Sequence, residues 1–134
     1  MSFTSTLYLG PVLDMLLQDV PPLWRMDLRL GLQEALVNAV KHGNCLDPSK
    51  IVLIHYTPLP GSYRWVIQDQ GTGFVPVPDL VCGRETCLRD AAESGRGLYI
   101  LDQIFDHVEW ADQGRQLTLI KHQHRPAATW TPWR

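Results

Sequence analysis

The chain has 134 residues, three cysteines and a formal net charge of −2, and this length predicts one domain. Apolar residues make up 45% of the chain and charged residues 19%, a composition that argues against intrinsic disorder. Because 12 basic residues face 14 acidic ones, direct nucleic-acid binding driven by bulk charge is not expected. No apolar stretch approaches the roughly 20 residues that cross a bilayer, so we expect no membrane partner.

The cysteines and the first residues predict a cellular compartment. The chain has an odd number of cysteines, and their spacing is not that of a metal site: Cys45, Cys82 and Cys87. This pattern indicates reduced thiols. The first six residues contain no basic region followed by an apolar block, so we expect no signal peptide. Together these features predict a cytoplasmic protein.

The predicted elements begin with two helices. Residues 11–19 predict a short helix that two prolines then end. Apolar residues recur at three- and four-residue steps through 23–42, which predicts a longer helix. Gly43 and Asn44 follow it, and they predict a left-handed cap at its end.

The rest of the chain predicts strands and one further helix. Four segments have strand patterns: residues 51–56, 63–67, 108–110 and 117–120. We expect a turn at 58–62 between the first two and a turn at Gln113-Gly114 between the last two. A long connection at 74–94 leads to a helix that opens at Gly95. This order of elements predicts an α+β fold and not a doubly wound sheet.

Three polar residues of the long predicted helix are the first candidates for binding chemistry. Glu34, Asn38 and His42 recur at four-residue steps, so they lie along one flank beside the apolar stripe. A carboxylate and a carboxamide at the border of a buried face are costly unless they are paired or used. An ordinary solvated flank is the alternative interpretation of this segment.

The second candidate segment follows a predicted strand. Asp69 is separated by one residue from Gly71, and Gly73 follows two residues later. This arrangement places a carboxylate at the end of a strand, beside glycines whose backbone can approach a ligand closely. An ordinary turn that contains an aspartate is the alternative.

The third candidate segment opens the last predicted helix. Gly95, Arg96 and Gly97 lie at its start, where free backbone N–H groups and the helix dipole favour phosphate. The segment is not a dinucleotide fingerprint, because Ile100 stands where a third glycine is needed. The chain also lacks the GxxxxGK[ST] pattern of a P-loop.

In this order and at this spacing, the three segments resemble the N, G1 and G2 boxes of the GHKL, or Bergerat, ATP-binding family. The boxes correspond to residues 34–43, 69–74 and 94–98, within a motif core of about 25–121. The resemblance implies a two-layer α/β sandwich with a mixed or antiparallel sheet, helices on one face, and ATP between the helices and a lid. It also implies a single domain over 1–134 with a flexible tail at 126–134.

The resemblance implies roles for individual residues. Asp69 is expected to accept a hydrogen bond from the adenine amino group, Asn38 to hold Mg²⁺ at the phosphates, and Glu34 to act as general base. The residues that it implies for ATP binding are Asn38, His42, Asp69, Gly71, Gly73, Gly95, Arg96, Gly97 and Leu98.

Within the family, the chain is most similar to the small anti-sigma-factor serine/threonine kinases. That similarity implies a kinase that phosphorylates a small antagonist protein and binds a sigma factor or similar regulator, with a homodimer possible. An ATP-dependent partner switch without phosphotransfer is the alternative. Arg115 stands where the family often has Thr, and Glu93 where some members have Arg; both favour the switch, whereas Glu34 favours the kinase. A histidine-kinase fragment is a third interpretation, which is weakened because no helical pair bearing a phosphorylatable histidine precedes residue 25.

Overall fold

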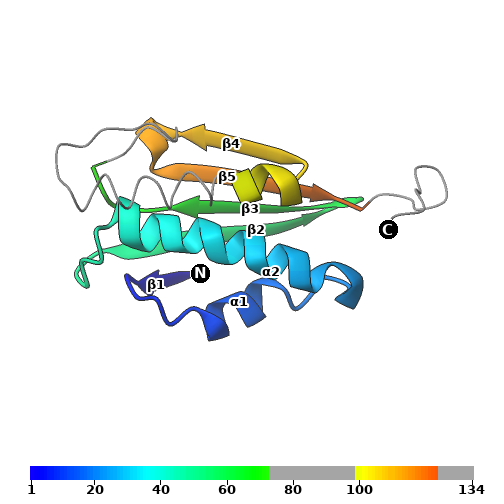
Figure 1. The fold of residues 1–134 in the computed structure, drawn as a ribbon, viewed down its shortest axis with the longest axis horizontal. Helices are drawn as coiled ribbons and strands as arrows, with labels where there is room; N and C mark the ends of the chain where they lie inside the picture. The colour runs from blue at the N-terminus through cyan, green and yellow to red at the C-terminus, as the bar shows by residue number, and fades with distance from the viewer. Residues whose placement is uncertain (73–98, 124–134) are drawn as a thin grey trace.

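The computed structural model describes residues 1–72 and 99–123 (Figure 1). The connection predicted at 74–94, the glycine-rich segment at 95–98 and the tail at 126–134 lie outside these residues. Residues 99–104 are helical. The other elements in chain order are β1 (Ser2–Thr4), α1 (Gly10–Leu16), α2 (Pro22–Val37), the π-helical segment η1 (Asn38–Gly43), β2 (Ile51–Leu59), β3 (Ser62–Gln68), β4 (His107–Ala111), the short 3₁₀ turn η2 (Asp112–Gly114) and β5 (Gln116–His122).

The strands form one five-stranded sheet in the order β1-β2-β3-β5-β4, and every neighbouring pair is antiparallel. α1, α2 and the helix at 99–104 lie on the same face of this sheet (Figure 1). The predicted α+β sandwich with helices on one face is therefore confirmed, and the sheet is antiparallel throughout. β1 was not predicted, because three residues are too few to show an alternating pattern.

The core lies between the helices and the sheet. Leu28, Leu32 and Leu36 recur at four-residue steps on α2 and are fully buried. From the sheet, Trp65 of β3 is also fully buried and stacks on Tyr56 of β2, with ring centroids 5.6 Å apart. These side chains fix α2 over the middle of the sheet, so the C-terminal end of α2 approaches the end of β3 where Asp69 follows.

The end of the long helix differs from its prediction. α2 passes at Asn38 into a wider π-helical turn, in which the N–H of Asn44 donates to the carbonyl oxygen of Ala39 at 2.8 Å. The prediction of a left-handed cap at Gly43 and Asn44 is wrong, since Asn44 has a φ of −84°. The left-handed residues are Cys45, with a φ of 53°, and Leu46, with a φ of 58°. Because of the wider turn, the helical segment continues to Gly43, which is buried, and the left-handed residues follow only at Cys45 and Leu46.

Both predicted hairpin turns are present, but their extents differ from prediction. β2 continues to Leu59 and β3 begins at Ser62, so the first turn contains only Pro60 and Gly61. Gly61 has a φ of 77°, which glycine adopts without strain. The second turn includes Asp112, whose φ of 53° is also positive.

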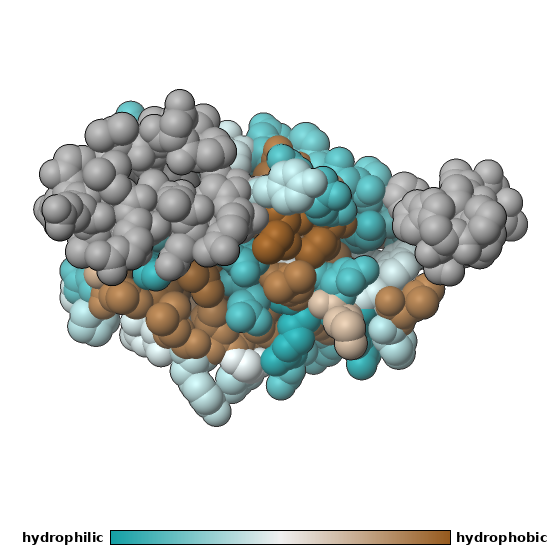
Figure 2. Space-filling view, viewed as in Figure 1, coloured by the Kyte–Doolittle hydropathy of each residue, from teal (hydrophilic) through white to brown (hydrophobic). Residues whose placement is uncertain are grey.

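Exposed apolar side chains gather over α1 and α2 on the face shown in Figure 2. The large ones on and just before these helices are Leu7, Tyr8, Met15, Leu23, Met26 and Leu30. Arg29 of α2 pairs with Asp14 of α1 at 2.7 Å and joins the two helices. Within the ranges described, no helix combines the length and apolar character that crossing a membrane requires.

Candidate functional site

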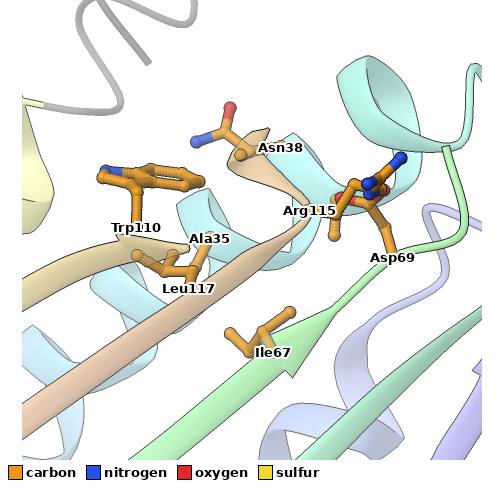
Figure 3. A pocket seen from close by; sticks show the side chains of 9 residues that line it. Ala35, Asn38, Ile67, Asp69, Trp110, Arg115 and Leu117 are labelled. Atoms are coloured by element: carbon orange, nitrogen blue, oxygen red, sulfur yellow. The ribbon is translucent and has the colours of Figure 1, made fainter. Parts of the chain in front are cut away.

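A small cavity lies where the C-terminal part of α2, the end of β3 and the β4–β5 turn meet (Figure 3). It brings together Asn38 and Asp69, which come from two of the three segments predicted to bind ATP. The lining residues are Ala35, Asn38, Ala39, Ile67, Asp69, Trp110, Gly114, Arg115 and Leu117. The site therefore combines an apolar lining with two buried polar side chains and one arginine, as small-molecule sites commonly do.

Asp69 is the buried acidic group of the cavity, with 5% of its surface exposed. Its Oδ1 accepts a hydrogen bond of 2.8 Å from the N–H of Gly71. Burial raises the pKa of the Asp69 carboxyl above its ordinary value, whereas the Gly71 N–H and the positive charge of Arg115 act in the opposite direction. Such a buried, oriented carboxylate can accept a hydrogen bond from a ligand amino group.

Two glycines allow the backbone to pack directly against this carboxylate. A Cβ on Gly43 would collide with the Asp69 carboxylate, and a Cβ on Gly71 would collide with the carbonyl oxygen of Gly43. Gly43 is thus needed for close approach, and not for the left-handed cap that the sequence predicted. A larger residue at Gly43 would push directly on the Asp69 carboxylate, and one at Gly71 would push on the backbone of Gly43.

Asn38 is the second buried polar side chain, with 4% of its surface exposed. Its side-chain amide nitrogen is buried and has no hydrogen-bond partner among the residues described. Leaving a buried polar group unpaired costs roughly 1–3 kcal/mol. The free amide N–H of Asn38 is a donor that suits an acceptor such as a phosphate oxygen, and the side-chain oxygen is the atom that could ligate Mg²⁺.

The other predicted site residues divide into two groups. Glu34 and His42 are both half-buried, and neither lines the cavity. Glu34 lies in the last turn of α2, four residues before Asn38, which begins the π-helical segment η1. His42 lies further along η1, where four-residue steps no longer keep one flank. Five predicted residues lie outside the described ranges: Gly73, Gly95, Arg96, Gly97 and Leu98.

The sequence did not predict two side chains that line the cavity. Trp110 is half-buried on β4, and its alternation with Val108 could have indicated a side chain facing the helices. Arg115 follows the β4–β5 turn and pairs with Asp112, with Nη2 2.9 Å from Oδ1 and Nε 3.3 Å from Oδ2. Its position departs from the family pattern, and no local signal in the sequence predicts that it lies beside Asp69.

The cavity is narrow in this conformation. Its volume is about 10 Å³, close to the minimum that holds one water molecule. A purine base is far larger than this enclosed space, so a base would enter it only with movement of lining side chains or would lie mainly at its open side. Trp110 and Arg115 are half-buried and lie at this site, which makes them the candidates for that movement.

The fold and the cavity define a class of protein. Residues 16–121 match the histidine kinase-like ATPase domain family, and this match covers most of the chain. The protein therefore belongs to that family, which confirms the resemblance to GHKL proteins, and membership implies ATP binding.

The particular relatives are bacterial regulators. The anti-sigma F factor of Halalkalibacterium halodurans is 27% identical over 72% of this chain and 68% of its own length. The anti-sigma F factor of Geobacillus kaustophilus is 28% identical over the same shares of the two chains. The serine-protein kinase RsbW of Bacillus licheniformis is 27% identical over 74% of this chain and 65% of its own length. These names support an anti-sigma kinase type of function.

Proposed function

We propose that this protein is a serine/threonine kinase of the anti-sigma type, which uses Mg·ATP to phosphorylate a small antagonist protein and binds a sigma factor or similar regulator. The observation that carries the proposal is the meeting of Asn38 and Asp69 in one cavity. The names of the relatives support the partner class, because they include anti-sigma F factors and a serine-protein kinase.

Asp69 provides the recognition of adenine in this proposal. Its buried carboxylate accepts a hydrogen bond from the exocyclic amino group, which distinguishes adenine from bases that carry an oxygen there. Ile67 and Leu117 supply apolar surface beside it. Gly71 and Gly43 let the backbone pack closely enough to hold the carboxylate in place.

Asn38 is the residue that would hold Mg²⁺. The described residues contain no group of three or more His, Cys, Asp or Glu side chains that could hold a metal ion by themselves. Mg²⁺ can instead be bound by one side-chain oxygen, here that of Asn38, together with phosphate oxygens and waters. When bound, the ion neutralises charge on the phosphates.

Glu34 provides the general base. The oxygen of a serine or threonine hydroxyl forms a bond to the γ-phosphorus, the bond from that phosphorus to the β-bridging oxygen breaks, and ADP leaves. The hydroxyl proton passes to the Glu34 carboxylate. The position of Glu34 supports this role, because it lies in the last turn of α2, one turn before Asn38, close to where the phosphates are expected.

A partner switch without phosphotransfer is the second candidate. Two observations favour it: Glu34 does not line the cavity, and Arg115 with its ion pair to Asp112 lies beside the adenine-binding carboxylate. In that case ATP changes partner affinity only. In either case we place the protein in the cytoplasm, in keeping with the exposed free thiol of Cys45, and we include a homodimer as its possible state.

The decisive experiment is a pull-down from the native cell extract with and without Mg·ATP, followed by incubation of the captured proteins with γ-labelled ATP. The kinase proposal expects label on a small captured protein, on serine or threonine. Nucleotide-dependent capture without label would establish the switch in its place. Capture that is insensitive to nucleotide, without label, would overturn both.

A further inference from the structure

Asn44 is a fully buried polar residue that lies next to the site without lining it, with 0% of its surface exposed. A ligand in the cavity therefore cannot contact it without a rearrangement of the fold. A buried carboxamide is costly unless its donors and acceptors are used. Its hydrogen bonds accordingly show what it does.

The side chain of Asn44 connects three separate parts of the chain. Its Nδ2 donates to the hydroxyl of Ser5 at 3.0 Å and to the carbonyl oxygen of Ile51 at 2.9 Å. Its Oδ1 accepts the backbone N–H of Gln70 at 2.7 Å. The Gln70 side chain reaches back in the opposite direction, where its Oε1 accepts the N–H of Ile51 at 2.8 Å. The residue after Asp69 is thus held at both its backbone and its side chain.

This connection fixes the distance between the two backbones that enclose the Asp69 carboxylate. Asn44 directly follows Gly43, which packs against that carboxylate, and it bonds to Gln70, which directly precedes Gly71. Gly71 in turn donates to Asp69 Oδ1 and touches the carbonyl oxygen of Gly43. A change in the Asn44–Gln70 distance would therefore move the backbone at both Gly43 and Gly71, the two segments that orient the Asp69 carboxylate.

We propose that Asn44 is a positioning residue for adenine selectivity: by bracing Gln70 it holds the Asp69 carboxylate in the orientation that accepts the adenine amino group. This inference rests on the proposed role of Asp69 in ATP binding. Asn44 acts through Asp69 and not on the phosphates, so its loss changes which base is bound as well as how tightly.

The test compares ATP with inosine triphosphate, which carries an oxygen in place of the adenine amino group. Asn44→Ala is expected to lose roughly tenfold in ATP affinity, the equivalent of one hydrogen bond, with little change for inosine triphosphate. Ser5→Ala is the matched control, because it removes a partner of the same carboxamide at the end remote from Gln70. It should keep the wild-type ratio of the two affinities even where it lowers the melting temperature. An unchanged ratio in a folded Asn44→Ala protein would overturn the proposal.

A second measurement on the wild-type protein needs no variant to fold. Backbone hydrogen exchange of free protein should show the Gln70 amide as protected as the amides of β3, since its N–H is bonded to a buried side chain. Exchange of Gln70 at the rate of an unprotected amide would also overturn the proposal. If the wild type binds both nucleotides equally, adenine recognition by Asp69 is refuted. Protection of the Gln70 amide would in that case still confirm the hydrogen bond from Gln70 to Asn44.

Discussion

The backbone N–H of Asp69 donates a hydrogen bond of 2.9 Å to the carbonyl oxygen of Arg115. This bond continues the pairing of β3 with β5 past the end of β3, and it joins the loop after β3 to the β4–β5 turn. The positive charge of Arg115 lowers the pKa of the Asp69 carboxyl, against the larger effect of burial, which raises it. The protonation of Asp69, the proposed adenine acceptor, therefore depends on Arg115 at the β4–β5 turn.

The first prediction concerns the pH dependence of ATP binding. ATP affinity should fall as pH falls through the raised pKa of Asp69, because the protonated carboxyl is a weaker acceptor. Arg115→Ala removes a cause that lowers this pKa, so the loss of affinity should begin at a higher pH than in the wild type. Titrations of ATP binding across acidic pH measure the midpoint. Arg115→Lys keeps the charge and controls for the titration of ATP itself; a common midpoint in all three proteins would contradict the prediction.

The second prediction concerns stability without nucleotide. The folded protein holds the pKa of Asp69 above the ordinary value of 3.8, so it binds that proton more tightly than the unfolded chain does. The free energy of unfolding therefore falls as pH rises from about 3.8 through the raised pKa. Asp69→Asn keeps an oxygen that can accept the Gly71 N–H and removes the buried charge.

This variant should melt at a higher temperature than the wild type at pH 7, and the difference should shrink below the ordinary carboxyl pKa. It should also lose the rise in melting temperature that saturating ATP gives the wild type, about 2.7 kcal/mol of stabilisation at 100 times the Kd. Thermal melts at several pH values, with and without ATP, measure both effects. A wild type that is the more stable of the two at neutral pH would refute the assignment of a costly buried carboxylate.

The sequence predicted the parts of this fold that depend on local periodicity. The spacing of Leu28, Leu32 and Leu36 identified α2, and the alternation along β3 identified its buried face. The π-helical turn was missed because nothing in the pattern from Asn38 to Gly43 separates it from an α-helix. It forms where Gly43 packs against Asp69, a contact between residues 26 apart in the chain.

The same limit applies to the site. Asn38 and Asp69 were predicted from motifs, and the structure places both in one cavity. Trp110 and Arg115 join them only because β4 and β5 pair at the end of the sheet beside β3, which no local signal encodes. Asn44 was interpreted as part of a helix cap because it follows a glycine, whereas its burial depends on Ser5 and Ile51.

The third prediction tests the close packing of the two glycines. Gly71→Ala places a methyl group against the carbonyl oxygen of Gly43, so the loop must shift and the Asp69 carboxylate with it. ATP affinity should fall by tenfold or more, roughly the loss of one charge-assisted hydrogen bond. Gly10→Ala is the control, because an added Cβ there meets nothing within 4 Å. Equal affinities in the two variants, measured by calorimetry, would show that the loop tolerates a wider spacing.

The fourth prediction follows from the narrow cavity. Because Trp110 lines the narrow cavity beside Asp69, we expect ATP binding there to change its surroundings. Intrinsic tryptophan fluorescence should change on addition of ATP, and most of that change should be absent from Trp110→Phe. Trp24→Phe is the control, since Trp24 packs on Tyr63 of β3 and does not line the cavity. A signal that survives in Trp110→Phe and disappears in Trp24→Phe would place the base elsewhere.

The last prediction separates phosphotransfer from nucleotide binding. Glu34 lies in the last turn of α2 and Asn38, four residues later, begins η1; of the two, only Asn38 lines the cavity. Glu34→Ala should therefore bind Mg·ATP at least as tightly as the wild type, since it removes a negative charge near the expected phosphates. Its transfer of label to the antagonist should fall by about 10²–10⁴-fold, the usual contribution of a general base. Asn38→Ala should lose both nucleotide affinity and transfer, because it removes the side chain expected to hold Mg²⁺.

Gln33→Ala serves as the matched control on the same helix, because Gln33 is exposed and neighbours Glu34. It should bind Mg·ATP and transfer label as the wild type does. The measurement sets label incorporation beside nucleotide affinity for each of the four proteins. Transfer at the wild-type rate by Glu34→Ala would assign the base to another residue, whereas normal Mg²⁺-dependent binding by Asn38→Ala would remove Asn38 from the metal site. Because the two residues are one helical turn apart, an affinity that is kept in Glu34→Ala and lost in Asn38→Ala cannot arise from a general loss of α2, and it would assign separate chemical roles to the two side chains.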